Sequence, residues 1–404
     1  MERQEPRRPM TREEAKALRE RQQLLKEKEK ESYELAGGPL DLPFLLLVIL
    51  LTGIGLVMLL SASFPSAYYI NGDPTHYFVR QGVFAVAGTV IMLLISRFNY
   101  QRLRQVAKPL LYFAIILLFL VLIPGIGITR NNATRWLGVG ELFTFQPSEI
   151  AKLVVVIYFA NSISKKKDKM NTTRYGVVPY VLILGFISVL MLLEPHLSGT
   201  VLIWGAGAVL MLVGGINWAW VLAAIAAAAG GAMLLITGVI SYGQSRIAMW
   251  RDPWIDAQKD GYQLVQSLLS IGSGGLLGVG LGKSRQKFLY LPEEHNDFIF
   301  AIVCEELGLI GASIIMLMFA ALILRGYWIA LHARDRFGSL LVVGVITLIA
   351  LQTFLNIGVV TGLLPTTGLS LPFFSYVGTA LMIQLAEMGI VLSVSRQMKP
   401  TKAG

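Results

Sequence analysis

Residues 250–311 read WRDPWIDAQKDGYQLVQSLLSIGSGGLLGVGLGKSRQKFLYLPEEHNDFIFAIVCEELGLIG, a polar, glycine-rich stretch that ends in an apolar run. Long apolar runs make up most of the remaining chain, so this stretch marks where the polypeptide leaves a membrane and enters it again. Asp297 stands immediately before the apolar run that starts at Phe298. We interpret Asp297 as a carboxylate at the mouth of a membrane-embedded cavity, suited to chemistry on an anionic, lipid-linked substrate.

The composition is that of a membrane protein. Of the 404 residues, 54% are hydrophobic and 15% are charged, whereas soluble domains carry about 25% charged residues. The apolar runs reach the roughly 20 residues that a helix needs to cross a bilayer. Because open sheets leave backbone groups unsatisfied in lipid, we predict an all-α, polytopic membrane protein.

Ten apolar runs give ten predicted transmembrane helices, which places both ends of the chain on one side of the membrane. The runs cover residues 43–62, 77–96, 108–124, 148–164, 175–193, 199–215, 217–239, 298–323, 338–361 and 377–395. The predicted parts are a charged N-terminal segment (1–40), a transmembrane domain (41–396) and a short tail (397–404). A large extracytoplasmic loop, 240–297, separates predicted helices seven and eight.

Lysine and arginine residues in the short loops indicate which side of the membrane is cytoplasmic. They are Arg97, Arg102, Arg104, Lys108, Lys165, Lys166, Lys167, Lys169, Arg174, Arg325, Arg334, Arg336, Arg396, Lys399 and Lys402. Their loops share a side with the N-terminus, so we expect both termini in the cytoplasm. Much of the net charge of +10 lies in such loops, and we therefore predict a membrane protein that does not bind nucleic acid.

Two roles fit Asp297. Aspartate is a preferred N-cap residue, and the apolar run that follows has the pattern of a helix start. A carboxylate at a cavity mouth is also partly desolvated yet ionised near neutral pH, as a general base must be. Glu305 and Glu306 lie roughly 12 Å further along the same predicted helix. We assign them to packing or to a polar network rather than to the same proton transfer.

Lys283, Arg285 and Lys287 alternate along the outer loop, which would place them on one side of an extended segment. They form either an interfacial cluster that contacts lipid headgroups or a clamp that neutralises a pyrophosphate leaving group. In either case a cationic loop on the outer side indicates an anionic partner.

A second polar outer stretch contains Arg135 and Trp136 and leads into the fourth predicted helix. Arg135–Trp136 belongs either to the site or to an interfacial anchor, since tryptophan prefers that depth. Glu149 and Lys152 are three residues apart, a spacing at which side chains on a helix can pair. Charges inside a membrane are costly and mark functional positions, with mutual pairing as the alternative.

Several familiar patterns are absent. Gly282–Lys283–Ser284 has the letters of a nucleotide-binding loop, but Leu277 stands where that motif requires glycine. The single cysteine, Cys304, excludes an intrachain disulfide. The four histidines form no metal-ligand spacing, so no metal ligand is predicted.

A set of short motifs runs through the chain. They are Arg135–Trp136, Gln146–Glu149, Gly261–Gln263 with Gln266–Ser267, Gln286–Lys287, Tyr290–Glu293, Asp297–Phe300, Glu305–Gly308, Leu364–Pro365 and Leu371–Tyr376. In these motifs and their order the chain resembles the SEDS family (shape, elongation, division and sporulation), the FtsW/RodA/SpoVE polymerases. The resemblance covers nearly the whole chain and is nearer to FtsW and SpoVE than to RodA.

The resemblance implies a peptidoglycan glycosyltransferase that polymerises lipid II, a disaccharide-pentapeptide on a polyprenyl pyrophosphate, at the outer face of the bacterial cell membrane. It implies an inverting reaction with a β-1,4-linked product and undecaprenyl pyrophosphate as leaving group. The implied partners are a class B penicillin-binding protein and divisome or elongasome proteins. Cell division is the expected setting, and elongation and sporulation remain open alternatives.

The motifs and the resemblance together give a predicted site. Asp297 matches the essential acid of the family, and we expect it to act as the general base. The predicted substrate-binding residues are Arg135, Lys152, Glu149, Lys283, Arg285, Lys287 and Gln263. Arg135 and the three loop cations are expected to hold the pyrophosphate. No cofactor is assigned, and a divalent cation near the pyrophosphate is an open alternative.

The chain departs from the family pattern in three places. In Glu194–Thr200 (EPHLSGT), His196 replaces an acid and one residue is added. Ser375–Thr379 (SYVGT) and Asp252–Ala257 (DPWIDA) also differ from the family motifs. These departures bear on loop geometry and leave the Asp297 segment unchanged.

Two other functions fit parts of the sequence. A lipid II flippase would use the intramembrane Glu149, Lys152 and Glu305 as a translocation path. A non-catalytic scaffold would only recruit the penicillin-binding protein. Synthesis of glycan chains that depends on Asp297 distinguishes the transferase from both.

Overall fold

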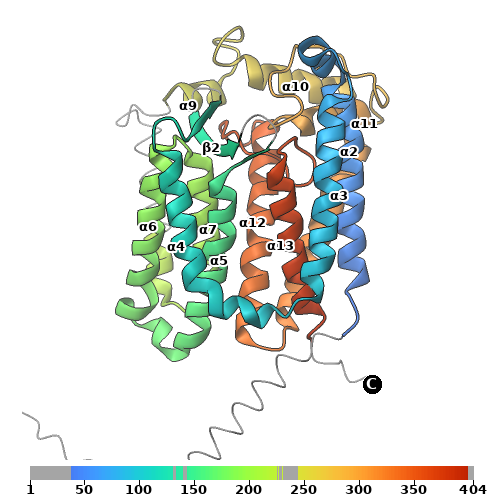
Figure 1. Ribbon diagram of the computed structural model, residues 1–404. Helices are drawn as coiled ribbons and strands as arrows, with labels where there is room; N and C mark the ends of the chain where they lie inside the picture. The colour runs from blue at the N-terminus through green and yellow to red at the C-terminus, as the bar shows by residue number, and fades with distance from the viewer. Residues whose placement is uncertain are drawn as a thin grey trace, which may run out of the picture.

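The computed structural model describes residues 38–130, 133–139, 143–224, 226, 230 and 244–398. Long helices run side by side and form one bundle (Figure 1). They are α2 (Leu42–Asn71), α3 (His76–Arg97), α4 (Leu103–Val121), α5 (Pro147–Lys166), α6 (Val178–Leu193), α7 (Leu197–Val213), α11 (Ile299–Leu331), α12 (Arg336–Val360) and α13 (Thr379–Ser395). The chain is thus a helical, multi-pass membrane protein.

Helix length and composition agree with six of the predicted spans, whereas α5, at the predicted span 148–164, is not among the described helices that are apolar enough to cross a membrane. Within the described residues, six helical segments are long and apolar enough to cross a membrane. They are Leu42–Asn71, His76–Arg97, Tyr100–Val121, Thr173–Leu193, Ile299–Leu331 and Arg336–Val360. Helices α7 and α13 are apolar but shorter. Most of the predicted seventh span, 217–239, and the charged segment 1–37 lie outside the described residues, so the count of ten helices stays a prediction.

The short elements gather at the two ends of the bundle. The turns η1 (Tyr100–Arg102), η2 (Lys167–Asn171) and η3 (Thr173–Val177) lie at one end. There Arg396 Nε donates to the carbonyl oxygen of Gly38 at 2.9 Å, which brings the start and the end of the described bundle together. Helices α9 (Gln244–Arg251) and α10 (Tyr262–Gly274) cover the opposite end (Figure 1).

A small antiparallel sheet stands at the same end as α9 and α10, which the all-α prediction did not include. Its strands are β1 (Ile128–Arg130), β2 (Ala133–Val139) and β3 (Phe143–Phe145), in the order β1-β2-β3. Leu137 of β2 pairs with Phe145 of β3 and packs against Leu117 and Val121 of α4. The second polar outer stretch is therefore a folded platform over the bundle rather than an open loop.

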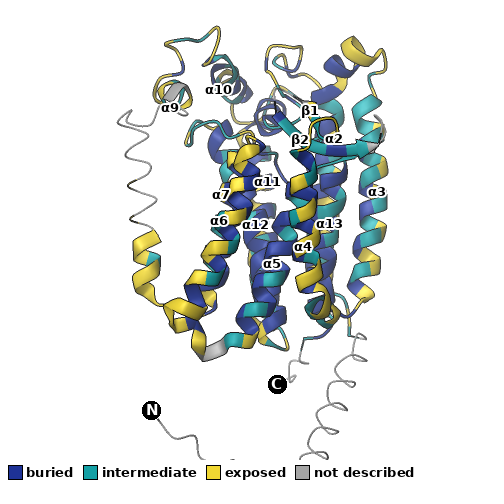
Figure 2. Cartoon of the chain, turned by 60° about the vertical axis from the view of Figure 1, so that its left-hand side comes forward, coloured by how far each residue is buried: buried dark blue, intermediate teal, exposed yellow. Residues whose placement is uncertain are grey.

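The bundle has a central helix. In the apolar part of α12, 72% of the residues are buried, compared with 22% in α3. Figure 2 shows α12 and much of α5 as buried, while exposed residues follow α3 and α4. The side chains that α4 exposes include Tyr112, Phe113 and Ile116. Such apolar side chains suit contact with lipid tails. Helix α12 packs against α5, α7, α11 and α13 at the centre of the bundle.

Helix α11 is broken at Gly308, where φ is 65° and ψ is −171°. The segment 275–280 runs beside the break and bonds to the backbone groups that it frees. Leu309 N–H donates to the Gly275 carbonyl at 2.9 Å, and Val279 N–H donates to the Glu305 carbonyl at 2.9 Å. Any side chain on Gly278 would overlap the Glu306 carbonyl. The glycines of this loop therefore allow a close backbone contact that positions the first part of α11.

A buried polar network ties the same loop to α2 and α11. Lys287 Nζ lies 3.0 Å from Glu306 Oε1 and 3.1 Å from Ser61 Oγ. The Ser284 hydroxyl donates to Glu305, and the Arg285 N–H donates to the other oxygen of Glu305 at 3.0 Å. Glu305 and Glu306 are thus network carboxylates, as the sequence predicts.

Replacement of Lys287 by alanine should destabilise the fold, because it leaves the Glu306 carboxylate buried without its cation. We expect the free energy of unfolding to fall by about 3–5 kcal/mol in a detergent-micelle denaturation series. The matched control is Lys283→Ala in the same loop. Lys283 is exposed, so its loss should change stability by about 0.5 kcal/mol or less. Equal effects of the two substitutions would contradict the proposed role of the network.

Candidate functional site

A cavity of about 520 Å³ opens at the end of the bundle that carries the sheet and α10. Its walls come from α3, β2, β3, α5, α10, α12, the start of α7, the segment 293–297 and the loop 368–378. Polar and aromatic residues dominate its lining, namely Tyr77, Arg80, Arg135, Trp136, Thr144, Gln146, Glu149, His196, Gln263, Glu293, His295, Asn296, Asp297, Gln352, Ser370 and Tyr376. Four of the predicted site residues, Asp297, Arg135, Glu149 and Gln263, are therefore brought together.

Asp297 lies just before α11, and its side chain is partly exposed to the cavity. Helix α11 begins at Ile299 with Phe298 in the N-cap position, so the prediction of Asp297 as the cap residue is wrong. Asn356 of α12 holds the backbone instead: its Nδ2 donates to the Asp297 carbonyl at 2.7 Å and to the Leu369 carbonyl at 2.6 Å. The Asp297 carboxyl group therefore does not cap α11 and lines the cavity instead.

The surroundings of Asp297 favour its protonated form. Burial is the main cause and raises the pKa of Asp297 to about 7, and the negative charge of Glu293 raises it further. Arg135 and His295 act in the opposite direction. A carboxyl group with a pKa near 7 is divided between its acid and base forms at neutral pH, as suits a general acid or base.

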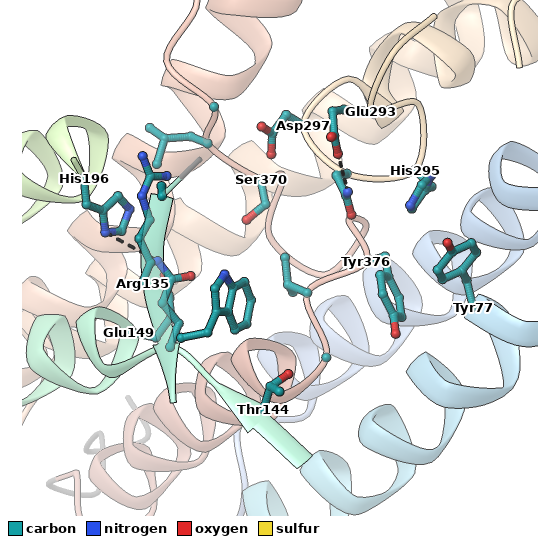
Figure 3. A pocket seen from close by; sticks show the side chains of 18 of the residues that line it. Tyr77, Arg135, Thr144, Glu149, His196, Glu293, His295, Asp297, Ser370 and Tyr376 are labelled. Atoms are coloured by element: carbon teal, nitrogen blue, oxygen red, sulfur yellow. Dashed lines mark hydrogen bonds between the residues drawn. The ribbon is translucent and has the colours of Figure 1, made fainter. Parts of the chain in front are cut away.

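Arg135 projects from β2 across from this acidic side (Figure 3). Its Nε donates to the Glu194 carbonyl at 3.1 Å, and a second guanidinium nitrogen donates to the Pro195 carbonyl. Backbone carbonyls between α6 and α7 therefore hold the guanidinium group in place. These two contacts fix the guanidinium group, and with it the positive charge of Arg135, at the cavity wall.

Beside Arg135, Glu194 and His196 are buried. Burial raises the pKa of Glu194 to about 8, and neither of its carboxyl oxygens has a hydrogen-bond partner among the described residues. Burial, together with the charges of Arg135 and Lys152, lowers the pKa of His196 to about 3. Where the family pattern has an acid, this chain thus places a neutral imidazole, whose Nδ1 lies 3.4 Å from Gln146 Nε2.

The Glu149–Lys152 pair forms as the spacing predicts. Lys152 Nζ lies 2.7 Å from Glu149 Oε2 and 3.4 Å from the side-chain oxygen of Gln352 on α12. Glu149 lines the cavity, whereas Lys152 is buried behind it. The pair therefore presents a carboxylate to the cavity and keeps its cation in the core.

The three loop cations lie elsewhere. None of Lys283, Arg285 and Lys287 is among the described residues that line the cavity. Lys287 is buried in the network with Glu306 and Ser61, whereas Lys283 and Arg285 are exposed. The single face expected from their alternation is not formed, because the segment turns at these positions instead of running as a strand.

Sequence reasoning missed two features of the cavity. Arg80 of α3 lines it, and a charge within an apolar run is a signal that could have identified this residue. Tyr77 stacks on His295 with ring centroids 4.6 Å apart and meets Tyr376 edge-on at 4.9 Å. Figure 3 shows these rings on the same side as Glu293 and Asp297. No local motif connects the three rings, which come from distant parts of the chain.

No group of three histidine, cysteine, aspartate or glutamate side chains in the described part of the chain could hold a metal ion. The divalent cation left open by the sequence therefore has no protein-only site among these residues, and no step of the chemistry below is assigned to it.

Comparison with known proteins places this geometry in context. The family model FTSW_RODA_SPOVE, described as "Cell cycle protein", matches residues 42–400. A "Probable peptidoglycan glycosyltransferase FtsW" of Geobacter metallireducens is 42% identical over 362 residues, which is 89% of this chain and 96% of the relative. "Stage V sporulation protein E" of Bacillus subtilis is 42% identical over 358 residues, covering 88% and 97%.

Solved structures with the same fold include a chain from "Structural coordination of polymerization and crosslinking by a peptidoglycan synthase complex". It superposes with a TM-score of 0.74 at 27% identity and covers 89% of this chain and 98% of its own. The rod shape determining protein RodA of Thermus thermophilus superposes with a TM-score of 0.67 at 26% identity, covering 90% and 99%.

The burial of Asp297 gives a prediction for stability. An unfolded aspartate loses its proton near pH 4, whereas the folded carboxyl group keeps its proton up to a pKa of about 7. Between these values the unfolded state binds fewer protons, so rising pH weakens the fold until the folded carboxyl group has ionised. Asp297→Asn removes this loss, and its thermal midpoint should exceed that of the wild type by more at pH 8 than at pH 5. A gain that is independent of pH would contradict the raised pKa.

Proposed function

The chain belongs to the FtsW/RodA/SpoVE family of cell cycle proteins, and on that basis we propose that it is a peptidoglycan glycosyltransferase that polymerises lipid II into glycan strands. The observation that carries this proposal is the Asp297 carboxyl group, with a pKa near 7, in a cavity that also contains the fixed guanidinium group of Arg135. A base and a cation in one cavity are what glycosyl transfer from a pyrophosphate requires.

In the proposed reaction, Asp297 accepts the proton of the 4-hydroxyl group of the acceptor sugar. The hydroxyl oxygen forms a bond to the anomeric carbon of the donor, and the bond from that carbon to the pyrophosphate oxygen breaks. The bonding electrons leave with the pyrophosphate, and attack from the opposite face converts an α-linked donor to a β-1,4-linked product. One carboxylate suffices because a pyrophosphate leaves without protonation, unlike the leaving groups of glycosidases.

The position of the cations refines the predicted substrate-binding set. Arg135 lines the cavity and can offset charge on the leaving group, whereas Arg80 adds a second positive charge to the cavity wall. Lys287 is committed to Glu306, and we assign it to the architecture. The exposure of Lys283 and Arg285 supports contact with anionic lipid headgroups, the other role considered for them. Glu149 and Gln263 remain candidates for contacts with the sugars.

We place the protein in the bacterial cell membrane with both termini in the cytoplasm. The basic loops lie at the end of the bundle opposite the sheet and α10 (Figure 1). Because the sheet and α10 contribute residues to the cavity, this arrangement supports a cavity that faces outward. A similar chain comes from a complex that coordinates polymerization with crosslinking. This supports a crosslinking partner, for which the resemblance implies a class B penicillin-binding protein. The family description "Cell cycle protein" and the relative named FtsW support a role in cell division, and the relative named a sporulation protein supports sporulation as the alternative.

The transferase is tested with the purified protein, its partner and lipid II, with moenomycin added to block other polymerases. Asp297→Asn should reduce glycan synthesis by about 10²–10⁴-fold, the range that a general base contributes. Asp252→Asn, an exposed acid of the same loop, is the matched control and should polymerise at the wild-type rate. Unchanged synthesis in Asp297→Asn would exclude the assigned base, and lipid II that crosses vesicles without polymer would favour a flippase.

The pH dependence of polymerisation tests the role of Asp297 separately. Because the base must be ionised, the rate should rise with pH and level off above a midpoint near 7, the pKa of Asp297. Glu293→Gln removes a negative charge that raises the pKa of Asp297, so the midpoint should move to lower pH. A midpoint that does not move in Glu293→Gln would contradict the assignment of the titrating group to Asp297.

A further inference from the structure

A second cavity of about 340 Å³ adjoins the first and shares part of its wall. The residues common to both are Arg135, Gln263 and Gly368. Beyond these, the second cavity is lined by Arg246 and Trp250 around α9 and by the loop that precedes Gly368. The volumes of both cavities lie within the roughly 300–1,000 Å³ typical of small-molecule sites. The two cavities are therefore adjacent and share one wall, which is formed by these three residues.

Asp297 lies against this shared wall. A Cβ atom added to Gly368 would stand 3.3 Å from Asp297 Oδ2, so the carboxyl group reaches the boundary between the cavities. Gly368 has φ +69°, a conformation that glycine adopts without strain. Across the same wall, Arg135 is held by the Glu194 and Pro195 carbonyls. A base and a cation therefore stand where the contents of the two cavities would meet.

The two cavities differ in charge. Among the described residues, three carboxylate side chains line the first cavity, with Arg80 and Arg135 as its arginines. The second is lined by Arg135 and Arg246 and by one acid, Asp260. The second cavity therefore has the higher ratio of positive to negative charge, which favours an anion there.

Hydrogen-bond donors in the second cavity also suit a phosphate group. Arg246 reaches the loop above the cavity, where its Nη1 lies 3.4 Å from the Thr366 carbonyl oxygen. The Thr367 hydroxyl oxygen is buried and has no hydrogen-bond partner among the described residues. A phosphate oxygen would accept a bond from this hydroxyl and from the guanidinium groups.

We propose that the second cavity is the donor site, which binds the pyrophosphate and first sugar of the glycosyl donor, while the first cavity binds the acceptor sugar. This inference rests on the transferase function proposed above. At the boundary between the cavities, the acceptor oxygen forms a bond to the anomeric carbon as the bond from that carbon to the pyrophosphate oxygen breaks. The proton of the acceptor hydroxyl passes to Asp297, and the pyrophosphate stays with Arg135 and Arg246. Separate cavities explain how one lipid-linked sugar binds as the donor while a similar one binds as the acceptor.

Binding of farnesyl pyrophosphate to the full-length protein in detergent tests the donor site. Arg246→Ala should weaken this binding by about tenfold or more, as the loss of a charged hydrogen bond implies. The control is Arg251→Ala, an exposed arginine of α9 that lines neither cavity, and it should bind as the wild type does. Farnesol and inorganic pyrophosphate separate the contributions of the two parts of the probe. With inorganic pyrophosphate, Arg246→Ala should still weaken binding. With farnesol, which has no phosphate, the substitution should leave binding unchanged.

Polymerisation gives a second readout on the same variants. Arg246→Ala should lower kcat/KM for lipid II by about tenfold or more while the pH midpoint set by Asp297 stays unchanged. If binding weakens in Arg80→Ala and not in Arg246→Ala, the pyrophosphate lies in the first cavity and the donor-site assignment is wrong. Wild-type polymerisation with unaltered probe binding in Arg246→Ala would also overturn it, while the proposed function would stand.

Discussion

The burial of one carboxyl group, that of Asp297, is the constraint on which the rest of the site depends. A carboxylate in a partly desolvated position weakens the fold when it ionises, so its surroundings must be held rigidly. Asn356 of the central helix supplies that support through bonds to the carbonyls of Asp297 and Leu369. The same contact joins the segment before α11 to the loop that carries Gly368, and so sets the distance between the Asp297 carboxyl group and the wall of the cavity.

The interruption of α11 also helps to hold the surroundings of Asp297 rigidly. At Gly308 the helix breaks, and the glycine-rich segment 275–280 satisfies the backbone groups that are released. The Lys287–Glu306 pair then ties the part of the loop that follows this segment to the core. A buried ion pair is a weak source of stability by itself, but loss of one partner is costly. Its effect here is to hold the loop before Asp297 in a single arrangement.

Sequence reasoning found the parts of the protein that local pattern determines. The long apolar runs predicted the helices, and the three-residue spacing of Glu149 and Lys152 predicted their pair. The position of Asp297 before an apolar run predicted that it lies at a cavity, and its role as the base stays a prediction. Sequence reasoning missed what depends on distant segments. Strands β1 and β3 are three residues each, too short for a periodic signal. The burial of Lys287 depends on Glu306 and Ser61, and no local pattern separates it from the exposed Lys283.

In the folded protein, we infer, the carboxyl group of Asp297 titrates near neutral pH. Infrared difference spectra of the wild type and Asp297→Asn, recorded across a pH series in detergent, isolate the carbonyl stretch of this one protonated side chain. The account predicts a band that disappears with a midpoint at the pKa of about 7. A midpoint near 4, the value of an unperturbed aspartate, would show a solvated carboxylate and contradict the account.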